Sequence, residues 1–163
     1  CVDRLVENLS KKGFTDVYVE WGGEIHCQGQ HPEKRPWTVF VSRLGNTDPS
    51  QAIAVLAINN SSIATSGDYL QNWTINSHVS LLNENNATTF FHIFDPKTLR
   101  PLESSLTSIA SASVTAPSCA FADGLATTAM MFPTLGEAEV WANTIKEKYP
   151  EISFWLVNRQ SEF

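Results

Sequence analysis

The sequence lacks several features that would assign a function at once. Its three cysteines, Cys1, Cys27 and Cys119, have no zinc-ligand spacing and cannot all pair with one another. No run approaches the roughly 18 consecutive apolar residues that a membrane-spanning helix needs. With 11 basic and 17 acidic residues the formal net charge is −6, which gives no electrostatic footprint for nucleic acid. Any phosphate group that this chain handles must therefore be held by backbone amides, a few basic residues or a metal.

The composition that remains is that of one globular domain. Hydrophobic residues make up 42% of the 163 residues and charged residues 17%, which is enough apolar surface for a sizeable core. The sequence has no internal repeat, and no Gly-, Pro- or Ser-rich linker divides it. The first residues, Cys1 to Val6, already have the pattern of a helix interior, without a start methionine or a signal peptide. We therefore expect a fragment or a processed chain.

Strand patterns outnumber helical patterns along the chain. Apolar residues recur at helical spacing in residues 2–12, 119–131 and 136–148. Alternating or β-rich runs predict strands at residues 17–21, 24–29, 37–41, 52–58, 89–94, 106–117 and 152–157. Residues 70–87 are polar and rich in asparagine, which favours a loop or an irregular hairpin. The sequence predicts an α+β fold, with a mainly antiparallel sheet covered by helices on one face.

Residues 119–131 carry the most specific candidate chemistry. They are typical of a helix of small residues in which Asp123 and Thr127 are four positions apart, so that both oxygens lie on one face. The neighbouring alanines and glycine leave room for a close approach to the backbone. A carboxylate and a hydroxyl oxygen suit a hard cation such as Mg²⁺. The residues alone are equally consistent with an ordinary amphipathic helix, in which Asp123 near the N-terminus suits the helix dipole.

Two glycine-containing segments are further candidates. Gly22-Gly23 lies between two predicted strands, where it forms either a plain turn or a place for a planar or phosphate ligand to lie against the backbone. Ser66-Gly67-Asp68 combines a hydroxyl, a permissive backbone and a carboxylate in three residues. An Asx-type turn explains that combination equally well.

A histidine lies near the end of an aromatic strand. His92 belongs to residues 89–94, and Asp95-Pro96 ends that strand sharply. Active sites are often built at strand ends, so His92 and Asp95 are candidates for acid–base catalysis. A histidine on an aromatic strand is also commonly a structural residue, and the residues alone leave both interpretations open.

Taken in order, these stretches resemble the ApbE-type FAD:protein FMN transferases, a family of bacterial flavin transferases. The matching stretches are Val2-Asp3-Arg4, Gly22-Gly23-Glu24-Ile25, Pro36-Trp37, Ala64-Thr65-Ser66-Gly67-Asp68-Tyr69, His92-Ile93-Phe94-Asp95-Pro96-Lys97-Thr98 and Ala122-Asp123-Gly124-Leu125-Ala126-Thr127. The resemblance covers nearly the whole chain, residues 1–163, but only the C-terminal portion of the usual family protein. It implies an ApbE or T-fold-like α+β architecture.

The resemblance implies a reaction. FAD is bound with Mg²⁺ on its pyrophosphate, a Ser or Thr hydroxyl of an acceptor flavoprotein attacks the phosphorus on the FMN side, and AMP leaves. Asp123 and Thr127 match the family's metal-binding pair, and the Ala126 carbonyl is a weaker candidate ligand; the metal would neutralise charge on the leaving phosphate. His92 falls in the family's His-Asp-Pro motif, a suitable place for the general base, and Asp95 could support it.

Other matched residues are implied to contact the nucleotide. They are Gly22, Gly23, Glu24, Ser66, Gly67, Asp68 and Thr98. The first three form the family's FAD-contacting turn, in which the glutamate hydrogen-bonds the nucleotide. The serine, glycine and aspartate form a second loop at the same site. The implied partners are FAD and an acceptor flavoprotein, with no nucleic acid.

The chain also departs from the family's pattern. Leu99 stands where family proteins usually have a glycine, in a turn that favours a positive φ. Residues 76–89 are longer than the usual hairpin. The family's Lys-Gly pair, close to a backbone ligand of the metal, precedes the first helix and is not in this sequence.

These departures keep alternatives open. One is a protein that binds FAD without transferring FMN, and a variant of it is an FAD pyrophosphatase in which water replaces the acceptor hydroxyl. Another is an ordinary α+β domain in which all the matched stretches are turns and caps. Family members are often exported and membrane-anchored in bacteria, but this sequence assigns no compartment.

Overall fold

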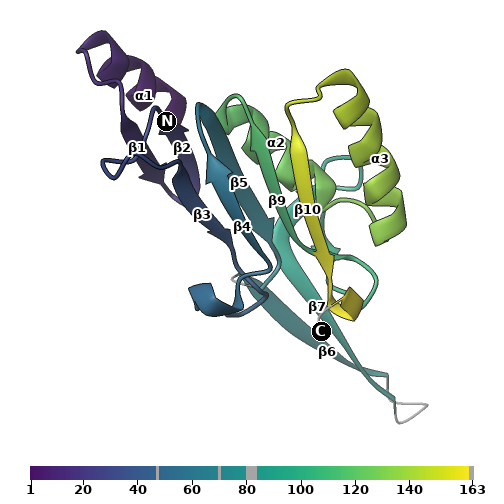
Figure 1. The fold of residues 1–163 in the computed structure, drawn as a ribbon. Coiled ribbons are helices and arrows are strands. Elements are labelled where there is room, and N and C mark those ends of the chain that lie inside the picture. The colour runs from purple at the N-terminus through teal and green to yellow at the C-terminus, as the bar shows by residue number, and fades with distance from the viewer. Residues whose placement is uncertain (47, 70, 80–83, 162–163) are drawn as a thin grey trace.

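The computed structural model describes residues 1–46, 48–69, 71–79 and 84–161 (Figure 1). Its helices are α1 (Val2–Lys11), α2 (Cys119–Ala129) and α3 (Leu135–Lys148), with short 3-10 turns η1 (Pro49–Gln51) and η2 (Arg159–Ser161). Its strands are β1 (Val17–Trp21), β2 (Glu24–Gln28), β3 (Trp37–Val41), β4 (Ala54–Ile58), β5 (Ser61–Gly67), β6 (Asn72–Val79), β7 (Glu84–Asp95), β8 (Arg100–Glu103), β9 (Ile109–Ala116) and β10 (Ser153–Asn158). No helix within the described ranges is long and apolar enough to cross a membrane.

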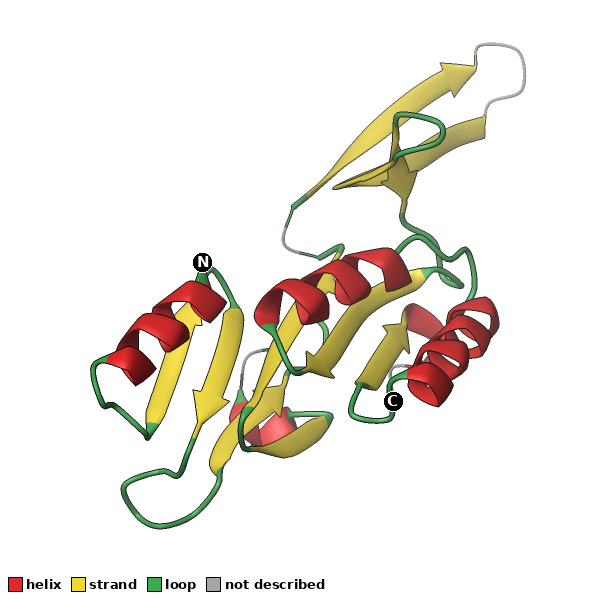
Figure 2. Cartoon of the chain, turned by 90° about the horizontal axis from the view of Figure 1, so that it is seen from above, coloured by secondary structure: helices red, strands yellow, loops and turns green. Residues whose placement is uncertain are grey.

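The central sheet has five strands in the order β1-β2-β5-β9-β10, and every neighbouring pair is antiparallel. Figure 2 shows α1 and α2 lying along one face of this sheet. Consecutive residues of β5 reach opposite faces: Ala64 packs in the cluster with α2, whereas Ile63 packs with the β3–β4 hairpin. The predicted α+β class, with mainly antiparallel strands and helices on one face, is confirmed.

The two-stranded β3–β4 sheet covers part of the other face. Its residues Val39, Val41 and Ile58 are buried against Cys27 of β2 and Ile63 of β5. Because the middle strands are covered on both sides, β9 is almost entirely buried, although small apolar residues alternate with hydroxyl-bearing residues along it.

Two side chains cap the start of α2. The Ser118 hydroxyl accepts a hydrogen bond from the Phe121 amide at 3.3 Å. The Asp3 carboxylate, in the first turn of α1, accepts from the amides of Cys119 at 2.7 Å and Ala120 at 3.0 Å. A helix begins with backbone N–H groups that have no partner in the helix, and one such cap contributes about 1 kcal/mol. Asp3 therefore fixes the start of α2 and joins α1 to it.

The chain outside the central sheet is more regular than its composition suggests. Residues 70–87 were expected to form a loop or an irregular hairpin, but β6 pairs with β7 from Asn72↔Phe91 to Val79↔Glu84. This ribbon projects from the body of the molecule (Figure 2), so polar residues suit its solvated faces. Residues 80–83 of the predicted interval lie outside the described residues.

The strands β5 and β8 were not predicted, because their short polar sequences form strands only through their neighbours.

Beneath α1, a histidine lies half-buried between two paired strands. His26 of β2 is directly opposite Ser62 of β5, and the His26 Nδ1 is 2.7 Å from the Ser62 hydroxyl. Burial lowers the pKa of His26, and the nearby Asp3 carboxylate offsets only part of that effect. The neutral imidazole is therefore the form that the fold stabilises.

Because the folded-state pKa of His26 is below its ordinary value, the unfolded chain binds a proton that the folded chain does not. The contribution of His26 is complete above about pH 6.5 and is lost as the pH falls through the lowered pKa. We expect His26→Gln to flatten the fall in unfolding free energy below about pH 6.5, as measured by urea unfolding. The difference in unfolding free energy between the unchanged protein and His26→Gln at about pH 8 is the baseline against which the difference at lower pH is compared. Parallel pH profiles would contradict this assignment.

Candidate functional site

A cavity of about 610 Å³ lies between α2, the β1–β2 turn, the end of β5 and the end of β7. It is lined by Gly22, Glu24, Thr65, Ser66, Gly67, Gln71, His92, Ile93, Phe94, Asp123 and Thr127. Most residues predicted from the sequence therefore face one hollow, although they come from distant parts of the chain. The structure does not place Gly23, Asp68, Asp95 or Thr98 among its lining residues.

The β1–β2 turn forms one wall. Gly22 and Gly23 have φ of +70° and +103°, and a two-residue hairpin turn of type I′ requires positive φ at both positions. A Cβ on Gly22 would lie 3.1 Å from the Glu24 Oε2, so the glycine also leaves space for that carboxylate. Glu24 lines both this cavity and a smaller hollow of about 230 Å³ beside Cys1. The turn thus presents backbone and one carboxylate to the cavity.

The opposite wall comes from α2. Ala122 and Ala126 are fully buried against the sheet, so the exposed Asp123 and the half-buried Thr127 are directed to the cavity side. The Thr127 hydroxyl is 3.0 Å from the Ser66 hydroxyl at the end of β5. Of the small residues of α2, Ala122, Ala126 and Ala129 are buried and permit this close packing, whereas Ala120 and Gly124 are exposed. The result is a group of carboxylate and hydroxyl oxygens on one side of the cavity.

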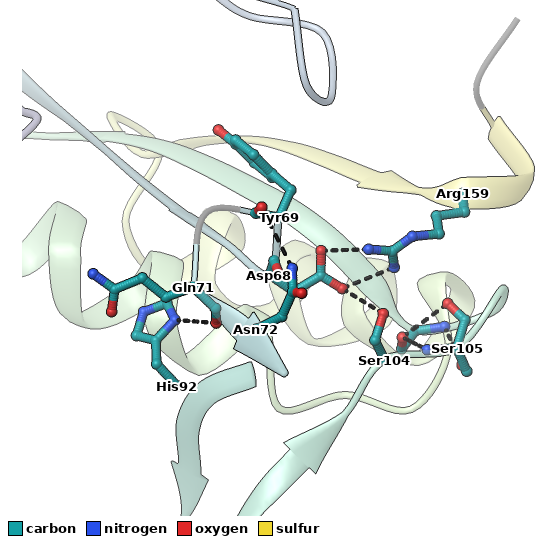
Figure 3. A network of polar contacts seen from close by, with 9 residues as sticks. Asp68, Tyr69, Gln71, Asn72, His92, Ser104, Ser105 and Arg159 are labelled. Atoms are coloured by element: carbon teal, nitrogen blue, oxygen red, sulfur yellow. Dashed lines mark hydrogen bonds and ion pairs between the residues drawn. The ribbon is translucent and has the colours of Figure 1, made fainter. Parts of the chain in front are cut away.

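His92 faces this group from β7. Its backbone amide donates to the Gln71 carbonyl at 3.2 Å, and its Nδ1 is 3.4 Å from the same oxygen (Figure 3). A carbonyl only accepts hydrogen bonds, so this contact favours the proton on Nδ1 and leaves the lone pair on Nε2. The side chain is exposed to the cavity. The Nε2 atom of His92 can therefore accept a proton from a hydroxyl group bound in the cavity.

Asp95 and Thr98 form a turn of their own. The Asp95 carboxylate accepts from the Lys97 amide at 2.8 Å and from the Thr98 hydroxyl at 3.1 Å. The Lys97 hydrogen bond is the main cause of a lowered pKa for Asp95. Both residues line a separate hollow of about 470 Å³. The structure thus gives Asp95 contacts within the turn that ends β7, rather than a contact with His92.

Asp68 is buried and has its own partners. Its carboxylate accepts two hydrogen bonds from the Arg159 guanidinium and one from the Ser104 hydroxyl (Figure 3). Gly67, its neighbour, lies against the Tyr69 ring, which a side chain at that position would displace. Ser66 and Gly67 reach the cavity, whereas the Asp68 side chain points to the interior.

The donors at the cavity fit a hard cation. The Asp123 carboxylate and the Thr127 hydroxyl are oxygen ligands one helical turn apart, and the Ser66 hydroxyl adjoins them. The residues that the structure describes contain no group of three or more His, Cys, Asp or Glu side chains arranged for a metal. This set therefore suits an ion that keeps water or phosphate oxygens in its shell, which is typical of Mg²⁺.

Comparison with known proteins gives the family. The family model described as "ApbE family" matches residues 1–152, which is most of the chain. The chain belongs to the ApbE family. It is 41% identical over 125 residues to the FAD:protein FMN transferase of Chlamydia pneumoniae, which covers 77% of this chain and 34% of that protein. It is 31% identical over 159 residues to the FAD:protein FMN transferase of Escherichia coli (strain K12), an alignment that covers 97% of this chain and 36% of that protein.

Solved ApbE structures have the same fold. The apo flavinyl transferase ApbE of Pseudomonas stutzeri superimposes with a TM-score of 0.71 at 23% identity, over 97% of this chain and 42% of that one. The flavin transferase ApbE from Vibrio cholerae superimposes with a TM-score of 0.66 at 27% identity, over 96% of this chain and 43% of that one. The chain thus spans about a third of the length of the curated relatives above, and less than half of these solved chains.

Some residues at or near this cavity could not be identified from the sequence. Gln71 contributes a backbone carbonyl, for which any residue would serve, and it falls in the polar interval expected as a loop. Phe94 lines the cavity, whereas the sequence predicted it only as part of the strand at residues 89–94. Arg159 lies 91 residues from Asp68, and no local pattern links them.

Leu99 adopts the left-handed backbone conformation that was expected for the glycine usual at this position. Its φ is +56°, and its amide donates to the Asp95 carbonyl at 2.8 Å, so the predicted left-handed conformation is present with a leucine in it. The side chain is 78% exposed and gains little from burial. An L-residue other than glycine is disfavoured by about 1–2 kcal/mol in this region.

We expect Leu99→Gly to raise the free energy of unfolding by about 1 kcal/mol, because it removes that strain while losing little packing. Urea unfolding measures the change. Leu106→Gly is the matched control: Leu106 is also exposed, at 64%, but is not among the residues with positive φ, so its replacement should be neutral or destabilising. Equal effects of the two replacements would contradict the assignment.

Proposed function

We propose that the protein containing this chain transfers FMN from FAD to a Ser or Thr hydroxyl of an acceptor flavoprotein and releases AMP, with Mg²⁺ at the site. One observation carries the proposal: His92 of β7 and the Asp123–Thr127 pair of α2 line the same cavity. The relatives named FAD:protein FMN transferase support the same class of reaction. The volume of about 610 Å³ gives room for part of a dinucleotide.

His92 is the proposed general base. The hydroxyl oxygen of the acceptor attacks the phosphorus on the FMN side, and its proton passes to the Nε2 of His92. The bond from that phosphorus to the bridging pyrophosphate oxygen breaks, and AMP leaves with this oxygen. The Gln71 carbonyl supports the role, since it keeps the proton on Nδ1 and Nε2 free to accept.

The charges at the cavity support a divalent cation. Its charged carboxyl-bearing residues are Glu24 and Asp123, and no Lys or Arg is among the described residues that line it. Pyrophosphate is an anion, so these carboxylates would repel it unless a cation lay between them. Asp123 and Thr127 would hold Mg²⁺, with the Ala126 carbonyl as a weaker ligand. When bound, the ion supplies neutralisation of charge on the leaving phosphate.

The remaining predicted residues take two kinds of role in this proposal. Gly22 and Glu24 form the wall along which the nucleotide lies, and Ser66 and Gly67 form its floor next to α2. Gly23 completes the turn that carries this wall. Those with buried or turn contacts, namely Asp68, Asp95 and Thr98, hold the segments that carry the cavity residues.

The direct test incubates the full-length protein with FAD, Mg²⁺ and an acceptor flavoprotein, and follows covalent flavin fluorescence on the acceptor together with AMP release. We expect His92→Gln to lower the rate constant by about 10²–10⁴-fold, the usual contribution of a positioned general base. His31→Gln is the matched control, since His31 lies in the loop before β3 and does not line the cavity.

The products decide between the possible reactions. Labelled acceptor with AMP supports the transferase. Free FMN and AMP without an adduct would identify an FAD pyrophosphatase, and FAD binding without AMP would identify a flavin-binding protein. Either of the last two results would overturn the proposed transfer.

A further inference from the structure

We propose that Arg159 is a positioning residue for this site and acts through Asp68 on the carbonyl that holds His92. The inference concerns the geometry of the imidazole, and only its kinetic readout rests on the proposed function. Arg159 lies beyond residue 152, where the match to the family model ends. Nothing in the matched motifs points to it.

The Asp68–Arg159 contact is a buried, two-pronged ion pair. The Arg159 Nη1 donates to the Asp68 Oδ2 at 2.8 Å, and the Nη2 donates to the Oδ1 at 2.7 Å. The Asp68 side chain is fully buried, whereas that of Arg159 is 30% exposed. The Ser104 hydroxyl donates to the Oδ2 at 2.9 Å. Since both oxygens are engaged by a planar guanidinium, the carboxylate has one orientation and cannot rotate freely.

The backbone of Asp68 is held by hydrogen bonds as well. The Asp68 amide donates to the Ala110 carbonyl at 3.0 Å, which anchors the residue to β9. The Asn72 side-chain amide donates to the Asp68 carbonyl at 2.9 Å, which ties Asn72 to the anchored Asp68. Gln71 directly precedes Asn72, and its carbonyl oxygen faces the His92 imidazole (Figure 3).

The residues on the other side of Asp68 reach the second half of the site. Gly67 and Ser66 line the cavity, and the Ser66 hydroxyl is 3.0 Å from that of Thr127 on α2. The Asp68–Arg159 pair therefore lies between two contacts of the site, the Gln71–His92 contact and the Ser66–Thr127 contact. η2, which begins with Arg159, directly follows β10, the edge strand of the central sheet. Arg159 thus connects the end of β10 to the site through Asp68.

A merely structural arginine and a positioning arginine predict different results. Without Arg159, a structural role lowers only the stability of the fold. A positioning role also changes the His92–Gln71 contact, and with it the fraction of imidazole that carries its proton on Nδ1. That fraction is read from the ¹⁵N chemical shifts of the imidazole ring, independently of any reaction.

The experiment compares Arg159→Gln and Arg159→Lys with the unchanged protein, each as the full-length polypeptide labelled with ¹⁵N-histidine. His92→Gln assigns the His92 signal. At about pH 8 we expect mainly the Nδ1–H form in the unchanged protein, a mixture of both tautomers in Arg159→Gln and partial recovery in Arg159→Lys, which keeps the charge but not the two-pronged contact. Arg35→Gln is the matched control, because Arg35 also pairs with a carboxylate, Glu33 at 2.9 Å, in an exposed loop.

In the transfer assay, run below the unfolding temperature of each variant, we expect Arg159→Gln to lower kcat about tenfold or more while the KM for FAD changes less than about twofold. A lower unfolding temperature with an unchanged imidazole spectrum and an unchanged kcat would overturn the proposal. If Arg159→Gln does not fold, the spectrum of Arg159→Lys gives the decision in the same way. If the unchanged protein transfers no FMN, the proposed function fails, and the imidazole spectra still decide the role of Arg159.

Discussion

The close packing of α2 on the central sheet is the constraint on which the site depends. Ala122 and Ala126 of the helix and Ala64 and Ala116 of the sheet are all buried in one cluster, so the helix axis lies near the strands. Larger residues at these positions would move the helix away from β5. Because α2 is held close, the side of the helix next to its buried face directs Asp123 and Thr127 to the end of β5, where the Ser66 hydroxyl meets that of Thr127.

Five carboxylates at or near the site divide into two groups by what they contact. Asp3, Asp68 and Asp95 accept hydrogen bonds from helix amides, from an arginine and from a turn amide respectively. A carboxylate with these partners stabilises the fold and has little capacity left for a ligand. Glu24 and Asp123 face the cavity instead. This division, which spacing alone does not reveal, separates the residues that build the site from those that can bind in it.

The sequence predicted the fold class, α2 and the two-glycine turn because each has a strong local signal. Asp123 and Thr127 share a face since helical periodicity requires it, and Gly22-Gly23 is a turn since both positions need positive φ. The sequence could not show that Asp68 points inward, because its orientation depends on Arg159, far along the chain. It also missed β5, whose Ser, Ala and Thr residues become a strand only between β2 and β9. Non-local contacts, rather than composition, decided these positions.

The central claim is that one cavity holds both the nucleotide and the cation, between α2 and β7. The most direct measurement is a crystal structure of the full-length protein grown with FAD and Mn²⁺, in which anomalous scattering locates the ion. The account predicts an anomalous peak at the Asp123 carboxylate and the Thr127 hydroxyl, with the FAD pyrophosphate beside it and the FMN phosphorus on the side of His92. An FAD molecule bound elsewhere, such as the hollow of about 420 Å³ lined by Glu139 and Asn143, with no ion at Asp123, would contradict it.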